Sequence, residues 1–177
     1  MWKTGDIIIK ITSDSLFPRL IRRFTGSNAS HAAIVYDENS MLEMDYAMKA
    51  VYNPVTKYSP KDIVIFRPAM ILEEREMLKT ILADLHGTPY SVWDIITNAL
   101  TSWLSSKIRK KIVGLLGTKK FAVCSELVAS AFYIFDPVRF ECMEDYEAIR
   151  PDDLKKICQL NPELFRDITN IIREKVS

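Results

Sequence analysis

The sequence is poor in the residues on which several classes of protein depend. Its 177 residues include only five glycines and eight prolines, which excludes a collagen-like or low-complexity chain. It has only two histidines, His31 and His86, and its three cysteines, Cys124, Cys142 and Cys158, show no paired spacing. We therefore expect neither a disulfide framework nor a zinc site. We predict no other cofactor.

The sequence also lacks a strong net charge and long apolar runs. Lys and Arg number 24 against 23 Asp and Glu, so the net charge of +1 provides no global field for nucleic acid, and we expect no such partner. No run of about 18 apolar residues is present to span a membrane. Residues 1–10 lack the apolar stretch of a signal peptide, which favours a cytoplasmic protein.

What is present is the pattern of one globular domain, with strands before helices. Hydrophobic residues make up 48% and charged residues 27%, and the length fits a single domain over 1–177. Apolar runs bounded by turn residues predict strands at 7–11, 31–36, 41–46, 51–52 and 63–66. Helical spacing predicts helices at 13–24, 73–85, 91–116, 123–135 and 164–176. This order predicts the α+β class rather than a parallel sheet.

Cys124 lies where the predicted helix 123–135 begins. A helix N-terminus carries positive partial charge and free N–H groups, which favour a thiolate and can bind an oxyanion. The alternative is a small apolar residue in a buried helix. Cys142 and Cys158 have no comparable setting, so we interpret them as structural thiols.

His31 opens a predicted strand directly after a loop, where an imidazole can act as a general base for a thiol. Glu43 and Asp45 share one face of the next strand, where a carboxylate could orient that imidazole. Whether His31 lies on that same face depends on the register of the two strands, which the sequence does not fix. The alternatives are a hydrogen-bonded strand histidine and solvent-facing acids. His86 follows a predicted helix, where the helix dipole accounts for it.

Six segments in order carry a resemblance to a known family. They are Gly5-Asp6 before an apolar strand, Ser30-His31, Glu43, residues 87–93 (GTPYSVW), residues 124–127 (CSEL) and residues 149–154 (IRPDDL). Together they resemble the circularly permuted branch of the papain-like, NlpC-type cysteine peptidase and amidase superfamily. That branch includes the Escherichia-type lipoprotein amidases and poxvirus relatives, and in it the histidine strand precedes the cysteine helix.

The resemblance implies a fold and a set of roles. The fold would be a small antiparallel, partly closed sheet with the cysteine helix packed on it. Cys124 would be the nucleophile, His31 the base and Glu43 the residue that orients His31, with Asp45 as the fallback acid. Tyr90 would lie near the oxyanion.

The segment 94–120 is a departure from that family pattern. Within it, residues 97–116 combine a wide apolar stripe with the basic cluster 107–111 (KIRKK). This combination fits a helix that contacts a membrane surface or lipid, or one that caps a hydrophobic groove. The alternative is a helical hairpin packed on the core with a solvated basic turn. The first interpretation would make the substrate acylated or lipid-like.

Together these features predict a cysteine hydrolase that cleaves an amide, thioester or ester bond of a peptide, a small molecule or an acyl lipid through an acyl-enzyme. An acyltransferase using the same three residues is a close alternative. A non-catalytic module that binds lipid or a protein partner is a second alternative, favoured by segment 97–116. The sequence leaves the oligomeric state open.

Overall fold

A six-stranded antiparallel sheet forms the centre of the computed structural model, which describes residues 2–11, 29–45, 49–88, 124–146 and 149–176. The strands are β1 (Ile7–Lys10), β2 (His31–Val35), β3 (Ser40–Asp45), β4 (Lys49–Pro54), β5 (Ile63–Pro68) and β6 (Phe165–Asp167). Their spatial order is β4-β3-β2-β1-β5-β6. The central strand β1 pairs with β2 on one side and with β5 on the other.

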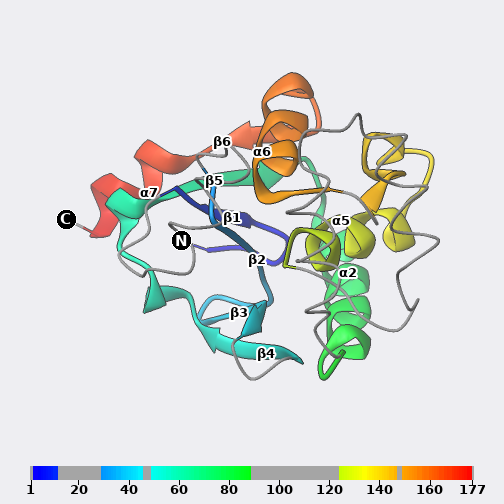
Figure 1. Ribbon diagram of the computed structural model, residues 1–177, viewed down its shortest axis with the longest axis horizontal. Coiled ribbons are helices and arrows are strands. Elements are labelled where there is room, and N and C mark those ends of the chain that lie inside the picture. The colour runs from blue at the N-terminus through cyan, green and yellow to red at the C-terminus, as the bar shows by residue number, and fades with distance from the viewer. Residues whose placement is uncertain (1, 12–28, 46–48, 89–123, 147–148, 177) are drawn as a thin grey trace, which may run out of the picture.

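Helices follow the first five strands along the chain, and β6 lies between the last two helices. The helices are α2 (Leu72–Leu85), α5 (Cys124–Phe135), α6 (Pro151–Leu160) and α7 (Thr169–Val176), with short 3-10 turns η1 (Val55–Lys57), η2 (Pro60–Asp62) and η3 (Glu141–Met143). Figure 1 shows α2 and α5 on one side of the sheet and α7 on the other. The α+β class predicted from the order of the segments is therefore confirmed.

Alternating side chains of the strands build an apolar layer on each face of the sheet. Ile7, Ile9 and Ile34 point to the face covered by α2 and α5, where they pack with residues such as Leu82 and Phe132. Their neighbours point to the face covered by α7 and by the segment around η1 and η2: Ile8, Ala33, Val35, Met41, Ile63, Ile65, Ile168 and Ile172. The uninterrupted apolar runs in the central strands follow from burial on both faces.

A buried ion pair holds the entry to β1. Gly5 adopts a positive φ of 89°, which a side chain would strain, and the chain turns there into the strand. The Asp6 carboxylate is fully buried and receives two hydrogen bonds from Arg67 of β5, Nε to Oδ1 at 2.8 Å and Nη2 to Oδ2 at 2.7 Å. This pair ties the start of β1 to its neighbour.

The C-terminal segment differs from the helix predicted over 164–176. Phe165–Asp167 instead forms the edge strand β6, which pairs with Phe66, Arg67 and Pro68 of β5. Phe165 is buried in the core, and the Asp167 Oδ1 accepts the Thr169 N–H at 2.9 Å, where α7 begins. Tertiary pairing therefore shortens the helix that the local pattern favours.

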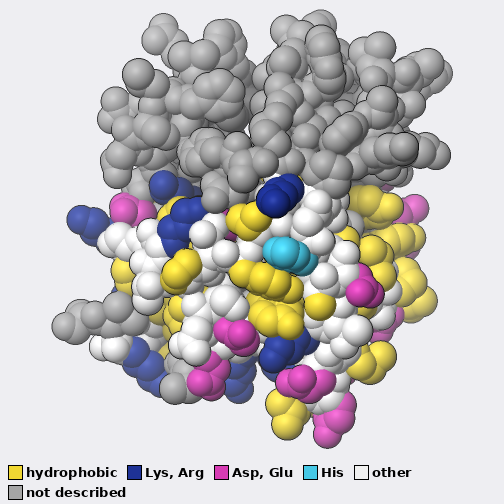
Figure 2. Space-filling view, turned by 90° about the horizontal axis from the view of Figure 1, so that it is seen from below, with side chains coloured by type: hydrophobic (Ala, Val, Ile, Leu, Met, Phe, Trp, Pro, Cys, Tyr) yellow, Lys and Arg dark blue, Asp and Glu magenta, His cyan; other side chains and the backbone are white. Residues whose placement is uncertain are grey.

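Several predicted features fall outside the described residues: the helix over 13–24, Tyr90, and the segments 94–120 and 97–116. The sheet was expected to be partly closed. Among the described strands, the pairings give an open row with β4 and β6 at its edges. None of the described helices has the length and apolar character needed to cross a membrane. Figure 2 shows acidic and basic side chains interspersed on one face, in keeping with the net charge of +1.

Candidate functional site

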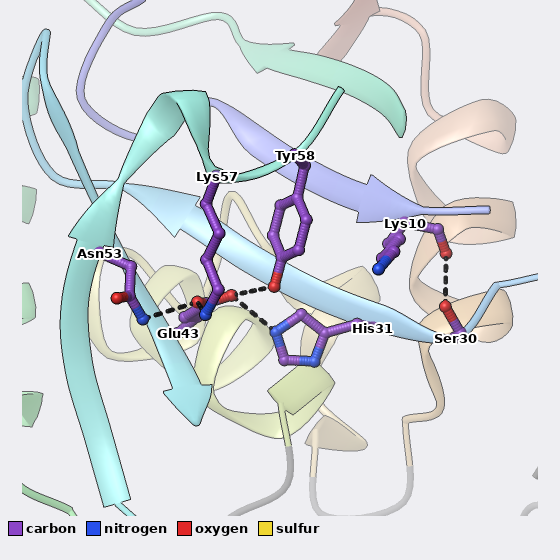
Figure 3. A network of polar contacts seen from close by, with 7 residues as sticks. All are labelled: Lys10, Ser30, His31, Glu43, Asn53, Lys57 and Tyr58. Carbon is purple, nitrogen blue, oxygen red and sulfur yellow. Dashed lines mark hydrogen bonds and ion pairs between the residues drawn. The ribbon is translucent and has the colours of Figure 1, made fainter. Parts of the chain in front are cut away.

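The register of β2 and β3 puts His31 and Glu43 on one face of the sheet. Glu43 pairs with Ala33, and His31 lies two residues before Ala33 on the same strand. Because side chains alternate and directly opposed residues share a face, His31 and Glu43 are diagonal neighbours. The His31 Nε2 donates to the Glu43 Oε2 at 2.8 Å (Figure 3).

The Glu43 carboxylate is fully buried and satisfied by four donors (Figure 3). The Oε2 accepts from His31 and from the Tyr58 hydroxyl at 2.5 Å. The Oε1 accepts from the Asn53 Nδ2 at 2.8 Å and forms an ion pair with the Lys57 ammonium. Burial alone would raise the pKa of Glu43, but these partners, His31 first, lower it to about 2. Glu43 is therefore a carboxylate across the working range of most enzymes.

Cys124 reaches this group from the first residue of α5. The helix packs on β2 through buried apolar residues such as Leu127 and Val128. This packing places the first residue of α5 near His31, the first residue of β2. The Ser125 hydroxyl, also buried, donates to the Ile149 carbonyl at 2.5 Å and fixes that start. The Cys124 thiol is buried too, with 7% of the residue exposed.

The thiol and the imidazole form a hydrogen bond and stabilise each other's charge. Burial alone would raise the pKa of Cys124, but the charge and hydrogen bond of His31 and the N–H groups of Ala32 and Ser125 bring that pKa below its ordinary value. Burial alone would lower the pKa of His31, but Cys124 and then Glu43 raise it to about 10. Since Glu43 occupies Nε2, the nitrogen left for Cys124 is Nδ1. Both shifts favour a thiolate facing an imidazolium over the neutral pair.

The structure adds three residues that the sequence did not indicate: Asn53, Lys57 and Tyr58. In the sequence this region indicates only turns between strands, because Asn53-Pro54 and Ser59-Pro60 are typical of turns. Asn53 lies two residues beyond Val51, the partner of Glu43, so it shares a face with Glu43. That relation follows from the register of β3 and β4, which the sequence does not specify.

The remaining predicted residues lie apart from this group or outside the described part. Asp45 ends β3 opposite Lys49, and its side chain is outside the described part, as is all of Tyr90. Cys142 is half-buried and Cys158 is buried, and burial raises the pKa of both thiols. Both pack in the core as structural thiols.

His86 also lies apart from the candidate site. It follows the last residue of α2, and its ring stacks on Tyr52, with centroids 4.7 Å apart and planes 6° apart. Ring stacking on β4 therefore accounts for its placement, together with its position at the helix end.

No family model matches the chain, and no curated protein matches its sequence. Among solved structures, the fold is similar to that of the metalloprotein yiiX from Escherichia coli O157:H7, a DUF1105 protein. The TM-score is 0.51 and the identity 20%, over 76% of this chain and 67% of that one. A likeness at this identity concerns the fold alone.

Proposed function

We propose that the protein is a cysteine hydrolase that cleaves an acyl bond through a thioester on Cys124. One observation carries the proposal: His31 contacts both Cys124 and Glu43, and its Nε2 is the nitrogen that Glu43 holds. A nucleophile, a base in contact with it and a third group that orients the base are the arrangement by which thiols and hydroxyls are activated.

In the proposed acylation, the Cys124 thiolate attacks the substrate carbonyl carbon and a C–S bond forms. Backbone N–H groups at the start of α5 stabilise the oxyanion, with Tyr90 assigned to the same task by resemblance alone. The His31 imidazolium gives the Nδ1 proton to the leaving nitrogen, oxygen or sulfur, and the carbonyl bond to that atom breaks. Glu43 holds the Nε2–H throughout, which keeps the ring in one orientation.

Deacylation uses the same groups in reverse. Neutral His31 takes a proton from water as the water oxygen attacks the thioester carbonyl. The C–S bond then breaks, an acid is released and the thiolate–imidazolium pair is restored. If a hydroxyl or amine takes the place of water, the same steps transfer the acyl group.

The chain order and the packing support a permuted papain-like fold for this enzyme. His31 and Glu43 lie on early strands, and Cys124 follows late, on a helix packed across an antiparallel sheet. The permuted branch has this order, as the sequence resemblance implies.

The description of the similar structure as a metalloprotein belongs to that protein. Among the residues described in this chain, no group of three or more His, Cys, Asp or Glu side chains stands close enough to hold a metal ion.

We further propose that the substrate carries an acyl chain, as an ester, thioester or amide. The apolar and basic segment 97–116 supports this choice from the sequence. On this proposal the segment contacts the acyl chain or a lipid surface, while Cys124 performs the chemistry.

The test is to trap the acyl-enzyme. The full chain is incubated with p-nitrophenyl esters of short and long acyl chains, with an acyl thioester and with an acyl amide, and is then analysed by intact mass and peptide mapping. We expect a mass increase of one acyl group on Cys124 and release of the free acid. Cys124→Ala should lose both, and the matched variant Cys142→Ala should keep both.

A negative result in this experiment would overturn the proposal. If no substrate acylates Cys124 or yields product, while iodoacetamide shows that Cys124 is accessible, the hydrolase proposal is wrong. A parallel reaction with glycerol or a primary amine separates hydrolysis from transfer, because a transferase releases the acylated acceptor instead of the free acid.

A further inference from the structure

The Glu43 carboxylate is shared by two cations. Figure 3 shows the Lys57 ammonium on its Oε1 and the His31 ring on its Oε2, with Asn53 and Tyr58 completing the set. Orienting one imidazole requires a single acceptor, so the Lys57 contact goes beyond what orientation requires. Lys57 keeps 32% of its side chain exposed, whereas Glu43 is fully buried.

Two cations on one carboxylate weaken each other's hold on it. Each neutralises part of the negative charge that the other faces, and the effect is large because Glu43 is out of water. His31 must release its proton to a leaving group and later accept one from water. A buried carboxylate that faced His31 alone would bind the imidazolium more tightly and oppose that release.

We propose that Lys57 is a positioning residue for the reaction: its ammonium offsets part of the Glu43 charge, which weakens the hold of Glu43 on the His31 proton. The catalytic meaning of this inference rests on the function proposed above. The charge relation among the three side chains does not, and it can be tested in an inactive protein.

Other charged or titratable groups in the described part of the chain also face this pair. Cys124 of α5 faces the His31 ring, and as a thiolate it favours the imidazolium. Tyr58 donates to the Glu43 Oε2, and its ring lies edge-on to His31 with centroids 6.1 Å apart. The Lys10 ammonium of β1 lies 5.1 Å from the centre of the Tyr58 ring and, as a cation, disfavours the imidazolium. Lys57 differs from Lys10 and Tyr58 because it forms an ion pair with Glu43 itself.

The experiment is a titration of the histidine Cε1–H resonances by NMR in full-length protein that carries Cys124→Ala. This background removes the thiolate and brings the His31 titration to a more accessible pH. His86, the other histidine of the sequence, is an internal control. Lys57→Met, Lys57→Gln and Lys57→Arg are compared with Lys156→Met, which removes an exposed lysine from α6.

We expect Lys57→Met and Lys57→Gln to raise the pKa of His31 by about one unit, because the charge is lost in both. Lys57→Gln keeps a donor for the Oε1, so it provides a folded test variant if Lys57→Met does not fold. Lys57→Arg and Lys156→Met should leave His31 within a few tenths of a unit, and His86 should not move in any variant. In the active protein, Lys57→Gln should move the alkaline limb of the pH–rate profile upward by a similar amount.

The inference is overturned if His31 titrates unchanged, or at lower pH, in a Lys57→Gln protein whose circular dichroism matches the parent. If the role of Lys57 were purely structural, its substitution would lower the stability of the protein without raising the pKa of His31. If the titration rises as expected but no substrate is cleaved, the charge relation stands and the hydrolase proposal fails, so the two failures are distinguishable.

Discussion

The Nε2 of His31 lies 2.8 Å from the Oε2 of Glu43, across two adjacent strands whose register makes the residues diagonal neighbours. A shift of that register by one residue would turn Glu43 to the opposite face of the sheet, against the layer covered by α2 and α5. The turn at 37–40 that sets the register is therefore as important to the site as the two side chains. Its Asp37 Oδ1 accepts the N–H groups of Asn39 at 2.9 Å and Ser40 at 2.8 Å, which fixes the turn.

The first prediction concerns the pH dependence of Cys124 alkylation. His31 lowers the pKa of Cys124, so iodoacetamide should label this thiol well below the pH of about 8.5 at which free thiols ionise. His31→Ala removes the imidazolium and should slow labelling at pH 6 roughly tenfold or more. Mass spectrometry of each cysteine peptide over a pH series measures both effects. If Cys124 is accessible and titrates as a free thiol, the proposed ion pair does not exist.

The second prediction concerns the other two thiols. Burial raises the pKa of Cys142 and Cys158, so neither should react at pH 7 in the folded protein. Half-buried Cys142 should begin to react at alkaline pH, before Cys158. In 6 M guanidinium chloride all three cysteines should label at similar rates. Fast labelling of Cys158 in the native state would contradict its place in the core.

The third prediction links Glu43 to acid stability. Its pKa is about 2 in the folded protein against an ordinary value of 4.5. Ionised Glu43 therefore contributes stability that is fully present above pH 4.5 and is lost as the pH falls through 2. The contribution is about 3 kcal/mol by linkage. Glu43→Gln should be less stable at pH 7 and should lose less stability between pH 4.5 and pH 2.

Urea unfolding of both proteins at pH 7, 4.5 and 2.5 measures this difference. The matched control is Glu76→Gln, which changes an exposed glutamate of α2 and should follow the parent at every pH. If the free energy of unfolding falls equally with pH in Glu43→Gln and in the parent, Glu43 is not the cause of the acid sensitivity.

The fourth prediction separates stability from chemistry. Arg67→Met leaves the Asp6 carboxylate buried without its two strongest donors and should cost about 3 kcal/mol. The pH dependence of Cys124 alkylation should not change, since neither residue touches the site. Arg166, the exposed cross-strand neighbour of Arg67, provides the control Arg166→Met, which should cost little. Equal losses in the two variants would exclude the buried pair as the cause.

The sequence predicted most of the sheet and the helices α2 and α5, but not α6. The apolar run Ile7–Lys10 and the helical spacing of Leu78 and Leu82 are signals that one element carries by itself. The edge strand β6 carries no such signal. It has three residues, of which two are exposed, and it is defined only by pairing with β5. Local patterning cannot report a pairing between segments so far apart in the sequence.

The residues of the candidate site differ in the same way: some carry a signal in the sequence, and others are placed only by the fold. Cys124, His31 and Glu43 were predicted from helix position, strand position and a family resemblance, and the structure brings these three together. Lys57 and Tyr58 were missed because their partner depends on how the chain turns after β4. A lysine beside a tyrosine in a turn is usually solvated, and only the fold reveals the buried carboxylate between them.

The four donors to Glu43 come from one uninterrupted stretch of chain, from His31 to Tyr58, whose strands β2, β3 and β4 are joined in sequence. Contacts between segments close in sequence form early, because they cost little loop entropy. During synthesis this stretch leaves the ribosome well before Cys124. We therefore expect the acid–base partners to assemble on the nascent chain before any nucleophile is available to them. The reactive thiol would join the site only when α5 docks.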